Sequence, residues 1–196
     1  MASLLVALEG LDQSGKQTQA ERLAARLRAD GRAVSLLSFP DYATPLGGEL
    51  GRALRGERAY GPELMQLLYV ANRYEHVGAI ASALAADGVV VCDRYLASSV
   101  AYGEAQGLDP AWLRDIQRHL PQPDVTILLD IAPEVSARRK SEGRDRYEQD
   151  LALLGRVRDS YLRQAAGGWT TIDADRERNL VAADVHAAIA RRLSPA

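Results

Sequence analysis

The sequence predicts an α/β fold in which a five-stranded parallel sheet lies between layers of helices. Three observations favour it. Short apolar runs recur along the 196 residues with little polar alternation, which is typical of strands buried on both faces. Helical patterns lie between successive runs, so strands and helices alternate along the chain. A loop bounded by two glycines and followed by a lysine joins the first run to the first helix.

The expected strands are short, and each is almost continuously hydrophobic. The first lies just before the glycine-bounded loop, and the third is followed by an acidic and a basic residue. They cover residues 4–8, 33–38, 89–92, 125–131 and 169–172.

Five helices are expected between and after these runs. In the first, Leu23 and Leu27 lie four residues apart, and Gly31 provides a C-terminal stop. The third opens with an Asp-Pro pair, which is a good helix start. The helices cover residues 19–29, 62–85, 110–119, 151–165 and 180–193.

Length and composition are those of an ordinary globular protein. A chain of 196 residues fits one domain, taken here as residues 1–196, and can bury a sizeable core. It is 47% apolar and 26% charged, and its net charge of −2 argues against a broad nucleic-acid or membrane surface. Small-molecule partners are therefore expected, with neither nucleic acid nor a membrane among them.

The single cysteine, Cys92, lies in an apolar run and is expected to be a buried structural thiol. One cysteine cannot form an intrachain disulfide, which suits a reducing cytosol. No run approaches the ~18 apolar residues of a membrane span, and the first residues lack a signal-peptide pattern. These features together predict a cytoplasmic protein.

The loop at residues 10–18 reads GLDQSGKQT and predicts a phosphate-binding P-loop. Gly10 and Gly15 permit backbone angles at which successive amides point inward around a polyphosphate. The positive end of the following helix adds to this field, and Lys16 supplies a point charge. The usual pattern has Ser or Thr after the lysine as a Mg²⁺ ligand, whereas this chain has Gln17 there and Thr18 one residue later.

A second polar pair follows the third strand. Asp93 and Arg94 stand at its carboxyl end, the edge at which open α/β sheets bind ligands. Asp93 is expected to bind a Mg²⁺-bound water or a hydroxyl. Arg94 is expected to bind a phosphate through two hydrogen bonds from its planar guanidinium group. The alternative is a salt bridge between neighbours at a strand end.

Residues 138–146 hold five basic and two acidic side chains around a glycine. A charge run alone usually means a solvated helix end. Beside a P-loop, it is better interpreted as a mobile basic flap over the phosphates, at about residues 138–150.

Ordered motifs along the chain resemble those of the thymidylate kinase family, from residue 4 to about residue 172. The P-loop is generic, whereas the Phe-Pro motif and the Asp-Arg-Tyr block are specific. The motifs are residues 10–18 (GLDQSGKQT), 39–42 (FPDY), 69–73 (YVANR), 93–102 (DRYLASSVAY) and 144–148 (RDRYE).

The resemblance implies a three-layer P-loop NTPase fold and ATP-dependent, Mg²⁺-dependent phosphorylation of dTMP to dTDP, on the path to dTTP. It also implies a homodimer formed through helices. Gly103 follows Tyr102 where glutamine is expected, so one polar contact near the base is missing.

The resemblance also assigns residues to roles. Asp12 meets the sugar 3′-hydroxyl or the metal, Tyr69 stacks on thymine, and Tyr102 packs beneath the sugar, where a 2′-hydroxyl would not fit. The implied catalytic residues are Asp12, Lys16, Asp93, Arg94, Arg144 and Arg146. ATP is assigned to Gly10, Gln13, Ser14, Gly15, Lys16, Gln17, Thr18 and Arg139. The acceptor dTMP is assigned to Asp12, Phe39, Pro40, Tyr42, Tyr69, Arg73, Arg94, Ser98, Ser99, Tyr102 and Glu148. Metal ligation, direct or through water, is assigned to Asp12, Asp93 and Glu148.

Other functions remain open from the residues alone. The chain could be another P-loop kinase, acting on small metabolites or deoxynucleosides, or an inactive relative, which Gln17 allows. It could also be a nucleotide-binding regulatory module such as a GTP switch. The Asn-Lys-x-Asp guanine signature is missing, since Lys16 and Lys140 are the only lysines.

The resemblance also implies a source for the arginine that stabilises the transition state, since members of this family supply it either from the P-loop or from the flap. The P-loop position after Asp12 is the uncharged Gln13, so the resemblance implies a flap arginine here. Arg144 and Arg146 adjoin the Tyr-Glu motif and are the first candidates, with Arg139 in reserve.

Overall fold

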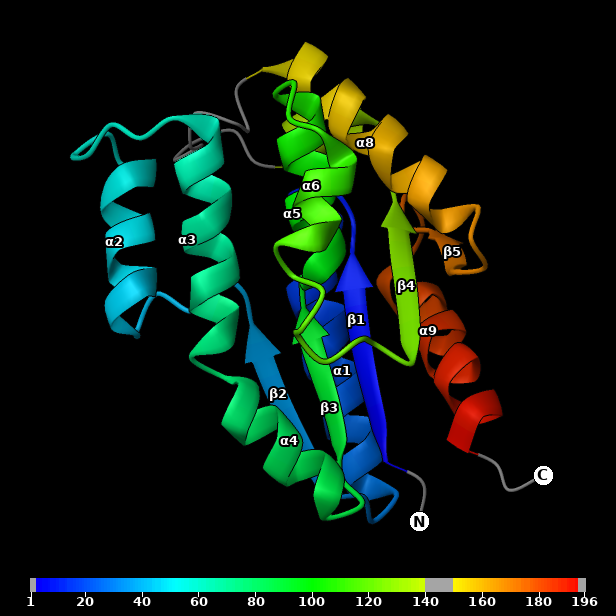
Figure 1. Ribbon diagram of the computed structural model, residues 1–196. Helices are drawn as coiled ribbons and strands as arrows, with labels where there is room; N and C mark the ends of the chain where they lie inside the picture. The colour runs from blue at the N-terminus through cyan, green and yellow to red at the C-terminus, as the bar shows by residue number, and fades with distance from the viewer. Residues whose placement is uncertain (1–2, 140–149, 194–196) are drawn as a thin grey trace.

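The computed structural model describes residues 3–139 and 150–193. Within them, five strands form one parallel sheet in the order β2-β3-β1-β4-β5 (Figure 1). The predicted α/β fold with a five-stranded parallel sheet flanked by helices is therefore confirmed. The strands are β1 (Leu4–Glu9), β2 (Val34–Ser38), β3 (Val89–Asp93), β4 (Val125–Asp130) and β5 (Thr170–Asp173).

Alternation along β1 divides the core between the two faces of the sheet. Leu4, Val6 and Leu8 belong to a cluster with the apolar side chains of α1 and α9. Leu5 and Ala7 belong to a second cluster, with side chains of α3, α4 and α5. All six residues of β1 are buried, as a central strand covered on both faces requires.

The helices follow the strands in a layered arrangement in which α5 and α8 pack side by side and α2 packs on α3 (Figure 1). Among the described residues, no helix has the length and apolar character needed to cross a membrane. The helices are α1 (Lys16–Ala29), α2 (Pro45–Leu54), α3 (Pro62–Tyr74), α4 (Val77–Ala85), α5 (Leu96–Ala105), α6 (Pro110–Asp115), α7 (Pro133–Arg139), α8 (Leu151–Ala165) and α9 (Arg178–Leu193).

The single helix predicted over residues 62–85 is wrong, because the structure divides it into α3 and α4 at residues 75–76. The cause is a set of contacts with the loop after β2. The Glu75 carboxylate accepts hydrogen bonds from Thr44 Oγ1 at 2.6 Å and from Asn72 Nδ2 at 2.9 Å. Asn72 Oδ1 in turn accepts from the backbone N–H of Asp41 at 2.9 Å. These contacts stop α3 at the rim of the sheet and let α4 turn back onto β3.

Two other expectations need correction. The strands at the edges of the sheet are not buried on both faces: β2 and β5 each keep exposed positions. The helices α2, α5 and α7 were not predicted, and α1 begins at Lys16 rather than at residue 19. The prediction of a buried, free Cys92 is confirmed.

The order of the strands places the glycine loop at the centre of the molecule. From β1 the chain moves outward to β2, and after β3 it crosses to β4 on the other side of β1. Ligands of open α/β sheets bind where the strand order reverses in this way, at the carboxyl ends of the strands. The loop after β1 and the segment after β3 both lie at this edge.

Candidate active site

The glycine loop has the backbone geometry of a phosphate cradle. Gly10 has φ 141° and Gly15 has φ 90°, both in the range that favours glycine. A Cβ on Gly10 would lie 2.4 Å from the carbonyl oxygen of Leu129, so β4 passes too close for any side chain. Gly15 caps α1 without a side-chain hydrogen bond, which leaves the first amides of the helix available to an anion.

Lys16 is buried beneath this loop, with 5% of its surface exposed. Its Nζ donates to the carbonyl of Leu11 at 2.6 Å and lies 3.5 Å from Ser14 Oγ. Burial, together with the charge of Arg94, lowers the pKa of Lys16 to about 8. The negative charge of a bound polyphosphate would stabilise the protonated form of Lys16 against both effects. The site of this ammonium group therefore suits an anionic ligand.

The lowered pKa of Lys16 predicts a rise in apo-protein stability with pH. Between about pH 8 and 10.5 the unfolded chain keeps the Lys16 proton while the folded chain loses it. Stability increases with pH wherever the unfolded state binds more protons, so the free energy of unfolding gains a contribution on the order of 1–3 kcal/mol across this window. Urea unfolding from pH 7.5 to 10 measures it. A Lys16→Met variant should lack this contribution, and equal pH profiles for the two proteins would contradict the burial argument.

A large cleft of about 1560 Å³, partly open to solvent, runs from the P-loop to the loop after β5. All the residues assigned to ATP except Gly10 line it. Arg139 of α7 reaches the P-loop, donating to the carbonyl of Gln13 at 3.1 Å and to that of Ala174 at 3.0 Å. The cleft also contains Arg176 and Arg178, which sequence reasoning missed because no motif marks them.

Gln17, the departure from the usual P-loop pattern, turns along the helix surface. Its Nε2 donates to Glu21 at 3.0 Å, one helical turn further on. Thr18, the hydroxyl residue that follows Gln17, lines the cleft and is half-buried. Gln17 therefore lines the donor cleft while its amide nitrogen is bonded to Glu21.

A second cleft, of about 580 Å³ and also partly open, lies between α3, α5 and the segment after β2. Every residue assigned to dTMP lines this cleft except Glu148. Glu148 lies outside the described residues, and so do the expected catalytic residues Arg144 and Arg146. Sequence reasoning missed three further lining residues, namely Leu54, Gln66 and Gln106.

The two clefts meet at an ion pair. Arg94 Nη2 donates to Asp12 Oδ1 at 2.5 Å, and Tyr102 Oη donates to Asp12 Oδ2 at 2.8 Å. Burial works against the charge of Asp12, but Arg94, Lys16 and these hydrogen bonds outweigh it and hold its pKa far below the usual range. Both groups are therefore ionised, and Asp12 has 28% of its side chain exposed.

Arg94 is fixed from several directions. Its backbone has φ 63°, an unusual angle for a residue with a side chain. Its Nη1 donates to the carbonyl of Gly10 at 3.1 Å and to the hydroxyls of Ser98 at 3.1 Å and Tyr161 at 3.2 Å. The guanidinium is thus held in place before any substrate arrives.

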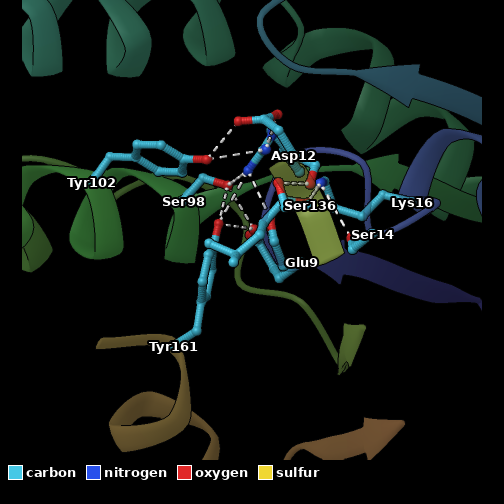
Figure 2. A network of polar contacts seen from close by, with 11 residues as sticks. Glu9, Asp12, Ser14, Lys16, Ser98, Tyr102, Ser136 and Tyr161 are labelled. Carbon is cyan, nitrogen blue, oxygen red and sulfur yellow. Dashed lines mark hydrogen bonds and ion pairs between the residues drawn. The ribbon is translucent and has the colours of Figure 1, made fainter. Parts of the chain in front are cut away.

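Behind Arg94 lies a buried carboxylate, Glu9, to which the sequence analysis assigns no role. Glu9 has no exposed surface and accepts from the backbone N–H of Tyr95 at 2.8 Å. It also accepts from Ser98 Oγ at 2.6 Å and Tyr161 Oη at 3.2 Å. Figure 2 shows Ser98 and Tyr161 converging on Glu9 beneath Asp12. The available signal was an acidic residue on a buried strand directly before the first glycine of the P-loop.

Arg73 is buried rather than displayed on the surface of its helix, with 3% of its area exposed. Its Nη1 donates to Ser99 Oγ at 2.8 Å and its Nη2 to the carbonyl of Tyr95 at 2.7 Å. These bonds tie α3 to α5 across the second cleft. Gly103, where glutamine was expected, faces α6: a Cβ there would lie 2.6 Å from Leu113, so no polar side chain could reach the base from it.

The acidic residues allow a metal ion without forming a complete cage. Among residues 3–139 and 150–193, no group of three or more acidic, His or Cys residues is arranged to hold a metal. Asp93 Oδ1 is nevertheless buried without a hydrogen-bond partner where the donor cleft passes β3. An unpaired buried carboxylate oxygen fits a cation held mainly by substrate phosphates and water, which is how Mg²⁺ usually binds.

A parallel sheet with a P-loop at its reversal point, and two clefts that meet beside that loop, define a phosphotransferase of the P-loop nucleotide kinase class. The thymidylate kinase family model matches residues 8–185 of the chain. The chain belongs to the thymidylate kinase family.

Relatives and a solved structure agree with this assignment. Thymidylate kinase of Thermomicrobium roseum is 39% identical over 199 residues, covering 95% of this chain and 94% of that protein. That of Caenorhabditis elegans is 34% identical over 197 residues, covering 93% and 88%. The structure of the Candida albicans enzyme matches with a TM-score of 0.87 at 27% identity, covering 97% of this chain and 92% of that one. The predicted family and fold are thereby confirmed.

Proposed function

We propose that the protein transfers the γ-phosphoryl group of ATP to dTMP, giving dTDP and ADP, as a step in dTTP synthesis. The main support for this proposal is that the two clefts share a wall: Asp12 and Arg94 line the donor cleft and the acceptor cleft. A donor on the P-loop and an acceptor in the second cleft would bring their phosphates together there.

The donor side supplies positive charge to the outer phosphates. The amides of the glycine loop and the start of α1 surround the polyphosphate, and Lys16 adds an ammonium group. Arg139, bonded to the loop at Gln13, adds charge at the rim. Mg²⁺ on the donor phosphates would supply further neutralisation, with Asp93, and Asp12 directly or through water, as the residues that hold it.

The acceptor side orients the attacking oxygen. Arg94, fixed by Asp12, Ser98 and Tyr161, holds the acceptor phosphate, and Asp12 accepts from the sugar 3′-hydroxyl. A dTMP phosphate oxygen attacks the γ-phosphorus in line, and the bond from that phosphorus to the bridging oxygen of ADP breaks. No general base is needed, because a phosphate monoester is already anionic near pH 7. Catalysis is therefore positioning and charge stabilisation.

A coupled ADP-release assay with dTMP, dUMP, dCMP, dGMP and UMP tests the proposal. The highest kcat/KM is expected with dTMP. Preference for a metabolite or deoxynucleoside over every monophosphate in the panel would favour another P-loop kinase instead. Nucleotide binding without turnover of any acceptor would indicate a regulatory module.

Replacing Tyr102 with alanine is expected to relax the preference for deoxyribose. The ratio of kcat/KM for dUMP to that for UMP, which differ only at the 2′-position, should fall roughly tenfold, a usual range for one steric contact. The KM for ATP should stay unchanged. The matched control is Tyr102→Phe, which keeps the ring but removes the hydrogen bond to Asp12 and should retain the sugar preference. If Tyr102→Ala leaves the ratio intact, the ring does not exclude the 2′-hydroxyl.

A flap arginine is proposed to stabilise the transition state, since Gln13 is uncharged. Single alanine substitutions at Arg139, Arg144 and Arg146 are expected to reveal one position at which kcat falls by about 10³–10⁵ with little change in the KM for dTMP. A solvated arginine would contribute less than ~1 kcal/mol. Three variants within a few-fold of the parent would eliminate this assignment.

We also propose that the protein is a homodimer joined through helices. The outer side of α3 supports this, since Leu64, Leu67 and Tyr74 are 45%, 43% and 44% exposed. Sedimentation of the purified chain measures the oligomeric state directly.

A further inference from the structure

The segment after β2 forms part of the wall between the two substrate clefts. Phe39, Pro40 and Tyr42 line both the donor cleft and the acceptor cleft. Asp41, which lies between Pro40 and Tyr42 in the chain, is not among the lining residues of either cleft. The position of residues 39–42 therefore affects both substrates, and Asp41 is the part of the segment that bonds to the rest of the protein.

Asn72 of α3 holds the backbone of Asp41 from outside the clefts. Asn72 is fully buried, its Oδ1 accepts from the N–H of Asp41 at 2.9 Å, and its Nδ2 lies 3.3 Å from the carbonyl oxygen of Asp41. Nδ2 also donates to Thr44 Oγ1 at 2.8 Å and to Glu75 Oε2 at 2.9 Å. The reversed amide would place two donors together at Asp41 and two acceptors together at Glu75, so the orientation of this side chain is fixed.

Thr44 and Glu75 complete what we call the Asn72 network, which consists of Thr44, Asn72 and Glu75. Thr44 Oγ1 donates to Glu75 Oε2 at 2.6 Å and accepts from the N–H of Gly47 at 3.1 Å, which caps α2. Desolvation works against the charge of Glu75, but the hydrogen bonds from Thr44 and Asn72 outweigh it and hold the pKa of Glu75 below its ordinary value. An ionised carboxylate therefore joins the start of α2 to the end of α3.

The first turn of α2 lies against the same segment, beside α3 (Figure 1). A Cβ on Gly47 would lie 1.7 Å from the carbonyl oxygen of Asp41, which leaves no space for a side chain. At the start of the segment, the N–H of Phe39 donates to the carbonyl of Asp93 at 3.0 Å. Residues 39–42 are thus held by the end of β3, by α2 and by α3. The members of the Asn72 network hold them without lining either cleft.

We propose that Thr44, Asn72 and Glu75 are positioning residues for phosphoryl transfer, because they fix the segment that separates donor and acceptor; the inference rests on the proposed function. In-line transfer depends on the placement of the attacking oxygen against the γ-phosphorus, and a misplacement of ~1 Å costs about 10²-fold in rate. Each substrate still contacts the other walls of its own cleft when the segment loosens. Loss of the network should therefore lower the rate of transfer more than it raises either KM.

The test replaces Thr44, whose hydroxyl bonds to both other members of the network. Thr44→Val removes the hydroxyl and keeps the shape of the side chain. The rate of a single turnover with dTMP at saturating ATP should fall about 10–100-fold, while the KM values for dTMP and ATP change by less than about threefold. Thr44→Ser keeps the hydroxyl and should retain the parent rate. Rates are expressed per site that binds ADP, so that unfolded protein is not counted.

Asp109→Ala is the matched control for the loss of a helix cap. Asp109 Oδ1 accepts from the N–H of Ala111 at 2.8 Å and caps α6, outside both clefts. This variant should lower the melting temperature about as much as Thr44→Val does, since each loses one N-cap. It should leave the single-turnover rate and both KM values unchanged.

A second variant displaces the segment without removing a polar group. Gly47→Ala places a methyl group against the carbonyl of Asp41 and should give the same fall in rate with little change in KM. Its control is Gly78→Ala in α4, where nothing lies within 4 Å of the added Cβ, and this variant should keep the parent kinetics. Gly47→Ala also keeps the test open if Thr44→Val folds poorly.

Two results would overturn the inference. One is a Thr44→Val or Gly47→Ala variant with a lower melting temperature but the parent rate per site, which indicates a purely structural role. The other is a loss that lies entirely in the KM for dTMP, which indicates that the network serves binding rather than alignment. Failure of the proposed function is distinguishable, because the unmodified protein would then not turn over dTMP at all.

Discussion

Replacing Lys16 with methionine is expected to lower kcat for dTMP phosphorylation by about 10²–10³-fold or more, the usual loss when a group that stabilises transition-state charge is removed. Lys16 is the first residue of α1, and its ammonium group lies at the glycine loop, bonded to Leu11 and near Ser14. No other lysine lies in the described residues. A coupled assay at saturating ATP and dTMP measures the loss.

The same variant should fold normally, which separates catalysis from stability. Methionine retains an unbranched stem and removes a charge that burial already disfavours. Its melting temperature should match or exceed that of the parent. A variant that keeps half of the parent activity would show that the glycine loop does not bind the transferred phosphate.

Replacing Arg94 with lysine is expected to lower kcat/KM for dTMP by about 10²–10³-fold, even though the charge is retained. Lysine has no planar fork, so it cannot bond Asp12, Ser98 and Tyr161 together and still face the acceptor phosphate. Part of the loss should appear as a weaker melting-temperature shift with dTMP alone. The binding of ATP alone should change little.

The control for this variant is Arg158→Lys. Arg158 of α8 makes a two-pronged pair with Asp130, with Nε and Nη2 each 2.8 Å from a carboxylate oxygen, outside both clefts. The exchange there should affect stability and leave kcat/KM unchanged. Equal kinetic losses from the two exchanges would mean that Arg94 acts only through the fold.

The fold and the main site residues were predictable because they depend on local signals. The apolar runs identified all five strands to within a residue or two, and the glycine loop and the Asp-Arg pair are contiguous motifs. Residues from four separate motifs, such as Asp12, Phe39, Arg73 and Tyr102, then lined one cleft as expected.

The features that were missed depend on partners far away in the sequence. The break between α3 and α4 arises from Glu75 bonding to Thr44, 31 residues away, and no local pattern records that contact. The burial of Glu9 depends on Tyr161, 152 residues away. Gln66 occupies a helical position that any polar residue could fill on a surface, and only the packing of α3 on α5 places it in the cleft. The roles of Arg144, Arg146 and Glu148 stay predictions.

The buried Glu9 has a consequence for how this family member can evolve. Its carboxylate accepts hydrogen bonds from Ser98 and Tyr161, and both of those hydroxyls also contact Arg94. A mutation at one of these positions removes a hydrogen bond from the others while they stay buried, so single steps are penalised. A joint replacement by apolar residues is penalised less than the sum of the single changes. Strong epistasis among positions 9, 98 and 161 follows, and substitutions there should be inherited as a set.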